Sequence, residues 1–189
     1  MNLFILSKDV EESAQMQCDK HAVKMIVESA QMLSTAHRML DGTSSKAPSK
    51  SGKRMVKHWK HPDEKLNEIL YKAVHHYHPC TVWTMKSNNN YNWHYAYFVA
   101  MCKEFEYRFG KVHSSWTLLK DILCTPPRNI EVGPKTQFPL AMKSNPECMF
   151  PDDPVKSYRL FYQTKQFRFK MRWTNRPVPN WFTYQVGAK

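Results

Sequence analysis

Residues 18–40 carry the strongest structural signal in the sequence, a sustained helical periodicity. At about 100° per residue, this segment has a core side and an opposite polar side. The core side is formed by Ala22, Met25, Ile26, Ser29, Leu33, Ala36 and Leu40. The polar side is formed by Lys20, Lys24, Glu28, Gln31 and Thr35. The pattern predicts a long helix with one buried face and one solvated face.

A second long helix is predicted over residues 88–110, and its side chains are apolar on nearly every side. Such a helix belongs in the middle of a bundle. Capping residues and prolines predict shorter helices elsewhere. We expect them from near Val10, from Asp63 to about Val74, from Pro79, over 114–123, and from Asp152 or Asp153 to about Phe167. No alternating run is long enough to build a sheet, so the chain is predicted to be mainly α.

A chain of 189 residues with 42% hydrophobic residues is long and apolar enough for one core. We therefore expect a single helical domain over 1–189, with a mobile basic loop over 42–62. The segment 126–154, with seven of the 12 prolines, is expected to be irregular. The tail 176–189 is expected to be extended, with Trp181 and Phe182 docked on the body.

Cysteine usage and hydropathy favour a reducing, non-membrane setting. The five cysteines are odd in number and never form CxxC, so we expect free thiols that mostly fill the core. The apolar start is too short for a secretory signal or a membrane span. These features predict a cytoplasmic protein with no membrane partner.

Positive charge is concentrated in two segments. The chain has 28 Lys and Arg against 16 Asp and Glu, a formal charge of +12. Segment 42–62 contains six basic residues and segment 156–176 contains seven, and neither contains an acidic residue. The rest of the chain is nearly neutral, so the excess charge forms two local patches.

Aromatic residues are interleaved with both basic segments, and this mixture suits nucleic acid. Cations neutralise phosphates, and aromatic or guanidinium planes stack on bases. The candidate nucleic-acid-binding residues are Lys53, Arg54, Lys57, Trp59 and Lys60 in the first segment and Arg168, Lys170, Arg172, Trp173 and Arg176 in the second. The alternative is that both segments are solvated faces without a partner.

Two features of the sequence could supply a reactive amine, a lysine–glutamate pair and the chain terminus. Lys24 and Glu28 are four residues apart on the first long helix, where an amine and a carboxylate meet. They could act as nucleophile and general acid/base if a ligand excluded water, or remain an exposed ion pair. The terminal α-amine, whose ordinary pKa is about 7.7–8.0, is another nucleophile able to form a Schiff base with a sugar C1′.

Cofactor and metal motifs are lacking in the sequence. His75, His76, His78 and Cys80 superficially resemble zinc ligands, but no second ligand pair completes a site. His21 and His113 stand alone. The sequence also lacks GxGxxG, GxxxxGK, GxSxG and HExxH. We therefore expect no metal, no cofactor and no ATP-driven chemistry.

Several strings resemble those of small bacteriophage proteins, including proteins of cyanobacterial phages. They are CDKHAVKMIVESAQML, HPCTVW, RFGKVH, DPVKSYRLFY and RPVPNWF. The layout also resembles the phage pyrimidine-dimer DNA glycosylase/AP-lyase family: a short apolar start, a first helix with basic residues and a glutamate, a basic aromatic-rich middle, and a late Trp-aromatic pair. The resemblance implies action in the cytoplasm of a phage-infected host cell.

The glycosylase resemblance implies a cofactor-free DNA glycosylase with lyase activity. In that family the terminal amine attacks C1′ and a first-helix glutamate assists, which implies roles here for Met1 and Glu28. Lys20 and Lys24 would hold phosphates. His21, next to Lys20, is a further catalytic candidate if the protein is instead an enzyme for a nucleotide or modified base. The family exposes a small second residue, whereas Asn2 is too large for efficient methionine removal, so the amine is expected on Met1.

Two other functions remain open. One is a non-catalytic DNA- or RNA-binding protein that acts in host takeover, with both patches on phosphates. The other is an enzyme for a nucleotide or modified base, with the helix side chains lining a closed pocket.

Overall fold

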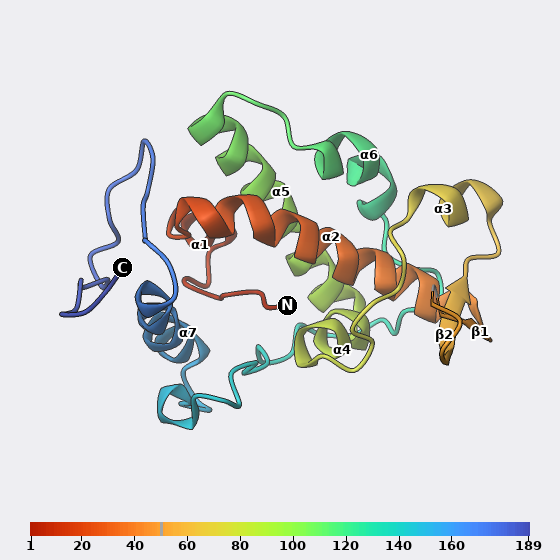
Figure 1. Ribbon diagram of the computed structural model, residues 1–189. Coiled ribbons are helices and arrows are strands. Elements are labelled where there is room, and N and C mark those ends of the chain that lie inside the picture. The colour runs from red at the N-terminus through yellow and green to blue at the C-terminus, as the bar shows by residue number, and fades with distance from the viewer. Residues whose placement is uncertain (50) are drawn as a thin grey trace.

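Two long helices cross at the centre of the molecule, as their periodicity predicts (Figure 1). The computed structural model describes residues 1–49 and 51–189, and Lys50 of the basic segment lies outside them. In chain order the elements are α1 (Val10–Gln15), α2 (Asp19–Leu40), β1 (Thr43–Pro48), β2 (Met55–Lys60), α3 (Glu64–Ile69), α4 (Pro79–Lys86), α5 (Asn88–Phe109), α6 (Ser114–Leu123), the 3-10 helix η1 (Pro146–Cys148), α7 (Pro154–Gln163) and the 3-10 helix η2 (Thr164–Phe167). The protein is thus mainly α-helical, with a small sheet.

Helix α2 organises the core because α4, α5 and α6 all contact it. Its predicted core side chains are buried except Leu40, which is half-buried, and Thr35 of the predicted polar side is buried as well. Helix α5 buries Tyr91, Tyr97 and Phe98 completely. At the other end of the chain, Phe182 is buried and Trp181 half-buried against the body, as expected of the tail. The free cysteines also follow the prediction, since four are buried and Cys124 is exposed.

The basic segment 42–62 differs from its prediction as a mobile loop, because it forms an antiparallel hairpin. Strands β1 and β2 pair from Thr43 opposite Lys60 to Pro48 opposite Met55. Most side chains on both strands are exposed, so the hairpin projects from the bundle. Segment 126–154 contains η1 and otherwise no helix or strand among its residues.

Arg38 fixes the base of this hairpin to α2. Its buried guanidinium donates to the carbonyl of Trp59 at 3.1 Å and to that of Leu70 at 2.8 Å. Because Leu70 and Tyr71 both give their carbonyls to Arg38, helix α3 ends at Ile69 instead of continuing to Val74. A side chain at Gly42 would collide with the Lys60 carbonyl, 2.6 Å from its Cβ position, so the close approach requires glycine.

Within the described residues, no helix has both the length and the apolar character that a membrane crossing requires.

Candidate active site and basic hollow

The chain start is fixed in the core without being part of a helix or strand. Leu3, Phe4, Ile5 and Leu6 are all buried. The Asn2 side chain accepts the N–H groups of Leu3 and Phe4 and donates to the Ala141 carbonyl at 3.1 Å. The segment therefore holds the terminal amine in one place, close to α4 (Figure 1).

The terminal amine lies against Glu28 on the polar side of α2. The Met1 nitrogen is 3.5 Å from Glu28 Oε2, and the Asn2 N–H donates to the same oxygen at 3.1 Å. Lys24, one helical turn earlier, places Nζ 3.1 Å from Glu28 Oε1. The Glu28 side chain is 12% exposed and Lys24 is 63% exposed. A primary amine and a carboxylate thus meet at the surface, drawn from the chain start and the first long helix.

Met1 exposes main-chain atoms and buries its side chain. Its side chain is only 2% exposed, and the sulfur lies 3.9 Å from the hydroxyl of Thr81 on α4. The residue as a whole is only half-buried, so its exposed surface is main chain. The thioether is directed into the protein and therefore does not cover the terminal amine from the solvent side.

His78 is the residue at this site whose role the sequence did not suggest. It caps α4, with Nδ1 accepting the Cys80 N–H at 3.2 Å, and it hydrogen-bonds the Met1 main chain. Burial lowers its pKa, and the charge of the neighbouring amine lowers it further. Its ring is therefore neutral near pH 7. The signal was the HPC sequence, where a capping residue precedes a first-turn proline.

The turn that carries His78 also presents an exposed aromatic ring. Tyr77 is 84% exposed, and His75 has a left-handed φ of 50°. His76 lies with its ring 6.1 Å from that of Trp59 on the hairpin. The turn thus links the amine to the hairpin.

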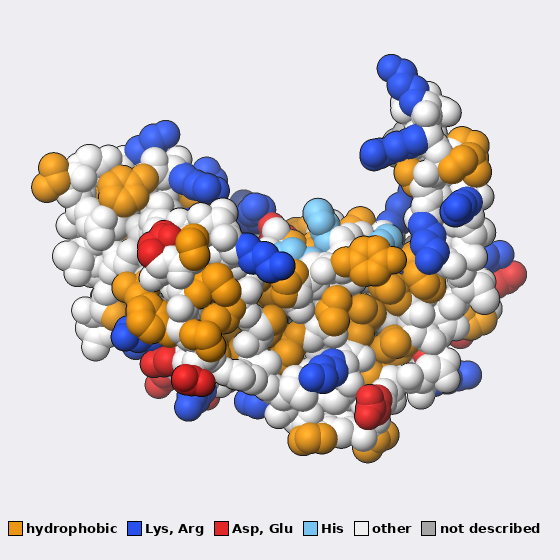
Figure 2. Space-filling view, turned by 90° about the horizontal axis from the view of Figure 1, so that it is seen from below, with side chains coloured by type: hydrophobic (Ala, Val, Ile, Leu, Met, Phe, Trp, Pro, Cys, Tyr) orange, Lys and Arg blue, Asp and Glu red, His pale blue; other side chains and the backbone are white. Residues whose placement is uncertain are grey.

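The amine lies between two basic parts of the molecule. Figure 2 shows a hollow, with the hairpin as the arm on its right and the part containing α7 and the C-terminal segment on its left. Lys and Arg side chains line both flanks, and histidines gather on the floor. The exposed basic residues are Lys46, Lys53, Arg54, Lys57 and Lys60 on the described part of the hairpin and Arg168, Lys170 and Arg172 after η2. Trp59 is half-buried, with the Lys57 ammonium 5.0 Å from its ring centre.

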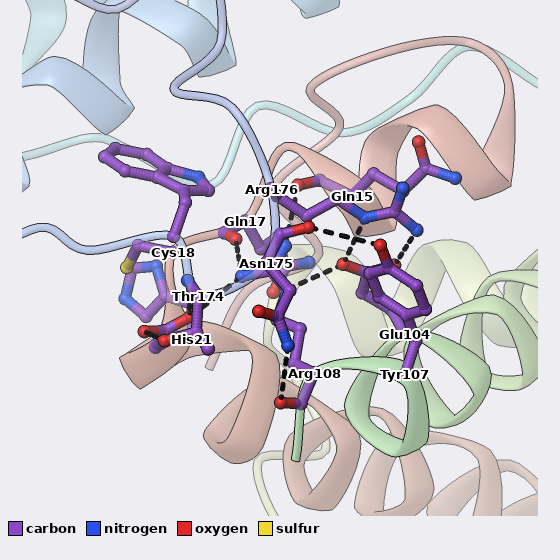
Figure 3. Close-up of polar contacts among 12 residues, drawn as sticks. Gln15, Gln17, Cys18, His21, Glu104, Tyr107, Arg108, Thr174, Asn175 and Arg176 are labelled. Carbon is purple, nitrogen blue, oxygen red and sulfur yellow. Dashed lines mark hydrogen bonds and ion pairs between the residues drawn. The ribbon is translucent and has the colours of Figure 1, made fainter. Parts of the chain in front are cut away.

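Two predicted nucleic-acid-binding residues have structural roles instead. Trp173 is buried, donating to the Met16 carbonyl at 2.9 Å and packing against Phe182. Arg176 pairs with the buried Glu104 at 2.8 Å and stacks 4.1 Å over the Tyr107 ring (Figure 3). Of the predicted nucleic-acid-binding residues in the second segment, only the exposed Arg168, Lys170 and Arg172 remain candidates.

His21 lies in the core, away from the Glu28 carboxylate where it was expected. Its Nδ1 lies 2.8 Å from the hydroxyl of Tyr162, and its ring stacks on Phe4 at 4.7 Å. Burial and nearby lysines lower its pKa to about 3. The neutral ring supports the N-terminal segment rather than a substrate. Lys20 is exposed, with its ammonium 4.6 Å from the centre of the Phe169 ring.

A third amine, that of Lys165, lies on η2, directly after α7. Burial and the charge of Arg168 lower its pKa to about 8, so a fraction is neutral at pH 7. Its ammonium lies 3.3 Å from the centre of the Phe161 ring. Lys165 contacts ring faces, whereas the Met1 amine has an acid/base partner.

No family model, curated protein or solved structure matches this chain.

Proposed function

We propose that the protein is a DNA N-glycosylase with AP-lyase activity, in which Met1 supplies the amine and Glu28 moves protons. The observation that carries this proposal is the Met1 nitrogen 3.5 Å from the Glu28 carboxylate, with the Met1 main chain partly exposed and the sulfur turned away. A nucleophile and an acid/base group in contact are the minimum that imine chemistry needs.

The base leaves in the first step. The Met1 nitrogen bonds to C1′ of a damaged nucleotide while the bond from C1′ to the base breaks, and the base leaves with that electron pair and takes a proton from water. Glu28 accepts a proton from the attached nitrogen. It then gives that proton to the sugar oxygen O4′ as the C1′–O4′ bond breaks, and the nitrogen lone pair forms the C=N bond of an iminium ion.

Strand cleavage follows from the same iminium ion. The positive nitrogen makes the hydrogens on C2′ acidic, and the Glu28 carboxylate removes one of them. The electron pair forms a C2′–C3′ double bond and expels the 3′ phosphate. Water then hydrolyses the iminium ion and restores the amine. No metal or cofactor enters any of these steps.

The surroundings of the amine favour DNA as the substrate. The two basic flanks neutralise phosphates on both sides of the hollow, and neutralised phosphates release counterions. A nucleotide must leave the base stack to reach the amine, and a damaged base costs least to flip. We place this activity in the cytoplasm of a phage-infected host cell.

Cleavage of an abasic-site duplex and of an ultraviolet-irradiated duplex, without added metal, tests the proposal. We expect Glu28→Gln to slow cleavage by about 10²–10⁴-fold, the usual contribution of a general acid/base. Glu106→Gln is the matched control, because Glu106 is exposed on α5 and outside the site. Circular dichroism of each variant verifies its fold.

Wild-type protein that binds duplex DNA but cuts neither substrate would favour the binding-only function. Cleavage by Glu28→Gln at the wild-type rate would remove Glu28 from the mechanism. Tighter binding of a mononucleotide than of duplex DNA would favour a nucleotide enzyme.

A further inference from the structure

A second cluster of chemically capable side chains lies at the far end of α2. His37 and Asp41 come from the last turn of α2 and its cap, and His61 directly follows β2. One ligand atom of each lies within 4.8 Å of the others. The cluster borders a cavity of about 510 Å³ that Leu66 and Ile122 also line. Glu28 comes thirteen residues before Asp41, which places it about 20 Å from the cluster at a helical rise of 1.5 Å per residue.

His61 has a buried nitrogen without a partner. The residue is only 5% exposed, and its Nε2 has no hydrogen-bond partner. The closest acidic oxygen, Asp41 Oδ2, is 3.9 Å away, which is too far for a hydrogen bond. Buried polar atoms are nearly always satisfied, so an unpaired one beside a cavity indicates a missing ligand.

The other two residues are already oriented by neighbours, as metal ligands usually are. The Asp41 oxygens accept the N–H groups of Arg128 and Asn129, both at 2.9 Å, and each oxygen keeps a free lone pair. His37 Nε2 lies 2.8 Å from the Tyr91 hydroxyl, which donates its own proton to the Leu123 carbonyl. His37 Nε2 is then the donor, which leaves Nδ1 with a lone pair, and a metal bound there would replace the contact of the ring with the Thr125 main chain.

We propose that His37, Asp41 and His61 bind a Zn²⁺ ion, with the fourth position open to the cavity. Two imidazoles and one carboxylate are ligands that zinc favours, and three protein ligands plus a water is a common zinc arrangement. Tetrahedral bonds of about 2.0–2.1 Å bring ligand atoms to about 3.3 Å from one another, so the cluster contracts on loading. His61 Nε2 and Asp41 Oδ2 have only to close from 3.9 Å.

Loading changes one hydrogen bond of His61. In the metal-free protein its Nδ1 accepts the Asp63 N–H at 3.1 Å. A metal on Nε2 places the ring proton on Nδ1, so this hydrogen bond opens as the metal binds. The site then joins the end of α2 to the base of the hairpin, next to Gly42. The ion would thus join α2 to the basic arm, and at about 20 Å from Glu28 it takes no part in the amine chemistry.

Zinc binding by untagged, chelator-stripped protein tests this inference. Native mass spectrometry with Zn²⁺ is expected to show one ion per chain, and Co²⁺ in its place is expected to give the intense visible absorption of a tetrahedral site. His61→Gln is expected to lose the ion, whereas His58→Gln, on the exposed side of β2, is expected to keep it. Hydrogen exchange at residues 42–44 and 58–62 is expected to slow when zinc is bound.

A wild-type protein that binds no Zn²⁺ at micromolar concentration would overturn the inference, and so would Zn²⁺ binding that survives His61→Gln. Loss of the ion in the His58→Gln control would overturn it too, because the ion would then lie on the hairpin surface. The wild-type Co²⁺ spectrum decides the matter even if His61→Gln fails to fold. None of these results depends on glycosylase activity.

Discussion

At the scale of single residues, Glu28 differs from the other acidic residues of the protein through the donors around it. Its oxygens lie within 3.5 Å of the Met1 amine, the Asn2 N–H and the Lys24 ammonium. The Lys24 ion pair is exposed and stabilises the fold by at most about 1 kcal/mol. The ion pair therefore adds little to the stability of the fold. What distinguishes the cluster is its chemistry, an amine beside a carboxylate.

Glu104 illustrates the opposite case, a carboxylate whose role is structural (Figure 3). It is buried and pairs with Arg108 at 2.6 Å and Arg176 at 2.8 Å. Glu104→Ala leaves the fully buried Arg108 with less compensation, so we expect a loss of about 3–5 kcal/mol in unfolding free energy. Arg176→Ala is the matched comparison and should cost about 1 kcal/mol, because Arg176 is partly exposed. Urea denaturation measures both, and equal losses would contradict these roles.

At the scale of elements, the sequence predicted those helices whose formation depends on the pattern of neighbouring residues. Helix α2 was predictable from its periodicity and α5 from its long apolar run, each over 22 residues, and Asp153 was one of the two caps expected for α7. The hairpin was missed because its base is held by Arg38, which lies 21 residues before its partner Trp59 in the sequence. The pattern of residues within one segment cannot predict a contact with a side chain from another segment.

The residues of the candidate site also fall into two groups, those that local spacing predicts and those whose role depends on distant partners. Glu28 and Lys24 were recognisable from their spacing on one helix face. The roles of Trp173 and Arg176 were not, because their partners Met16 and Glu104 come from distant parts of the chain. A buried aromatic and an exposed one look alike in sequence, and only the packing distinguishes them.

The hairpin is expected to bind phosphates. Lys53→Gln combined with Lys57→Gln should weaken duplex binding and flatten the plot of log affinity against log salt by up to about 0.9 for each phosphate that is no longer neutralised. The fold should be unaffected because both side chains are exposed. Lys103→Gln with Lys111→Gln is the matched control, since it removes the same charge outside both basic segments. Equal slopes for the two double variants would show that the hairpin does not bind DNA.

At the scale of the whole molecule, the fold places one reactive end of the chain between two cationic flanks (Figure 2). Helix α2 carries Glu28 beside the amine and continues to Arg38, which anchors the hairpin. The C-terminal segment supplies the other flank. Nucleophile, acid/base group and polyanion-binding surfaces are therefore all positioned by the packing around a single helix.

Buried histidines should make the whole fold sensitive to acid. Burial lowers the pKa of His94 to about 3, and burial with nearby lysines lowers that of His21 to about 3. Below about pH 6.5 the unfolded chain binds protons at these residues and the native protein does not, so stability falls as pH decreases. Each contributes up to about 1.4 kcal/mol per pH unit. Urea denaturation from about pH 7 to about pH 4 measures this, and a flat stability profile would contradict it.

The most direct test of the proposed chemistry is to locate the covalent bond between protein and DNA. Borohydride reduces an imine to a stable amine, so treating the protein with it on an abasic-site duplex should give a cross-linked product. Proteolysis and tandem mass spectrometry should place that product on the α-nitrogen of Met1. No cross-link, or one on Lys24 or Lys165 instead of Met1, would contradict the proposed role of the terminal amine.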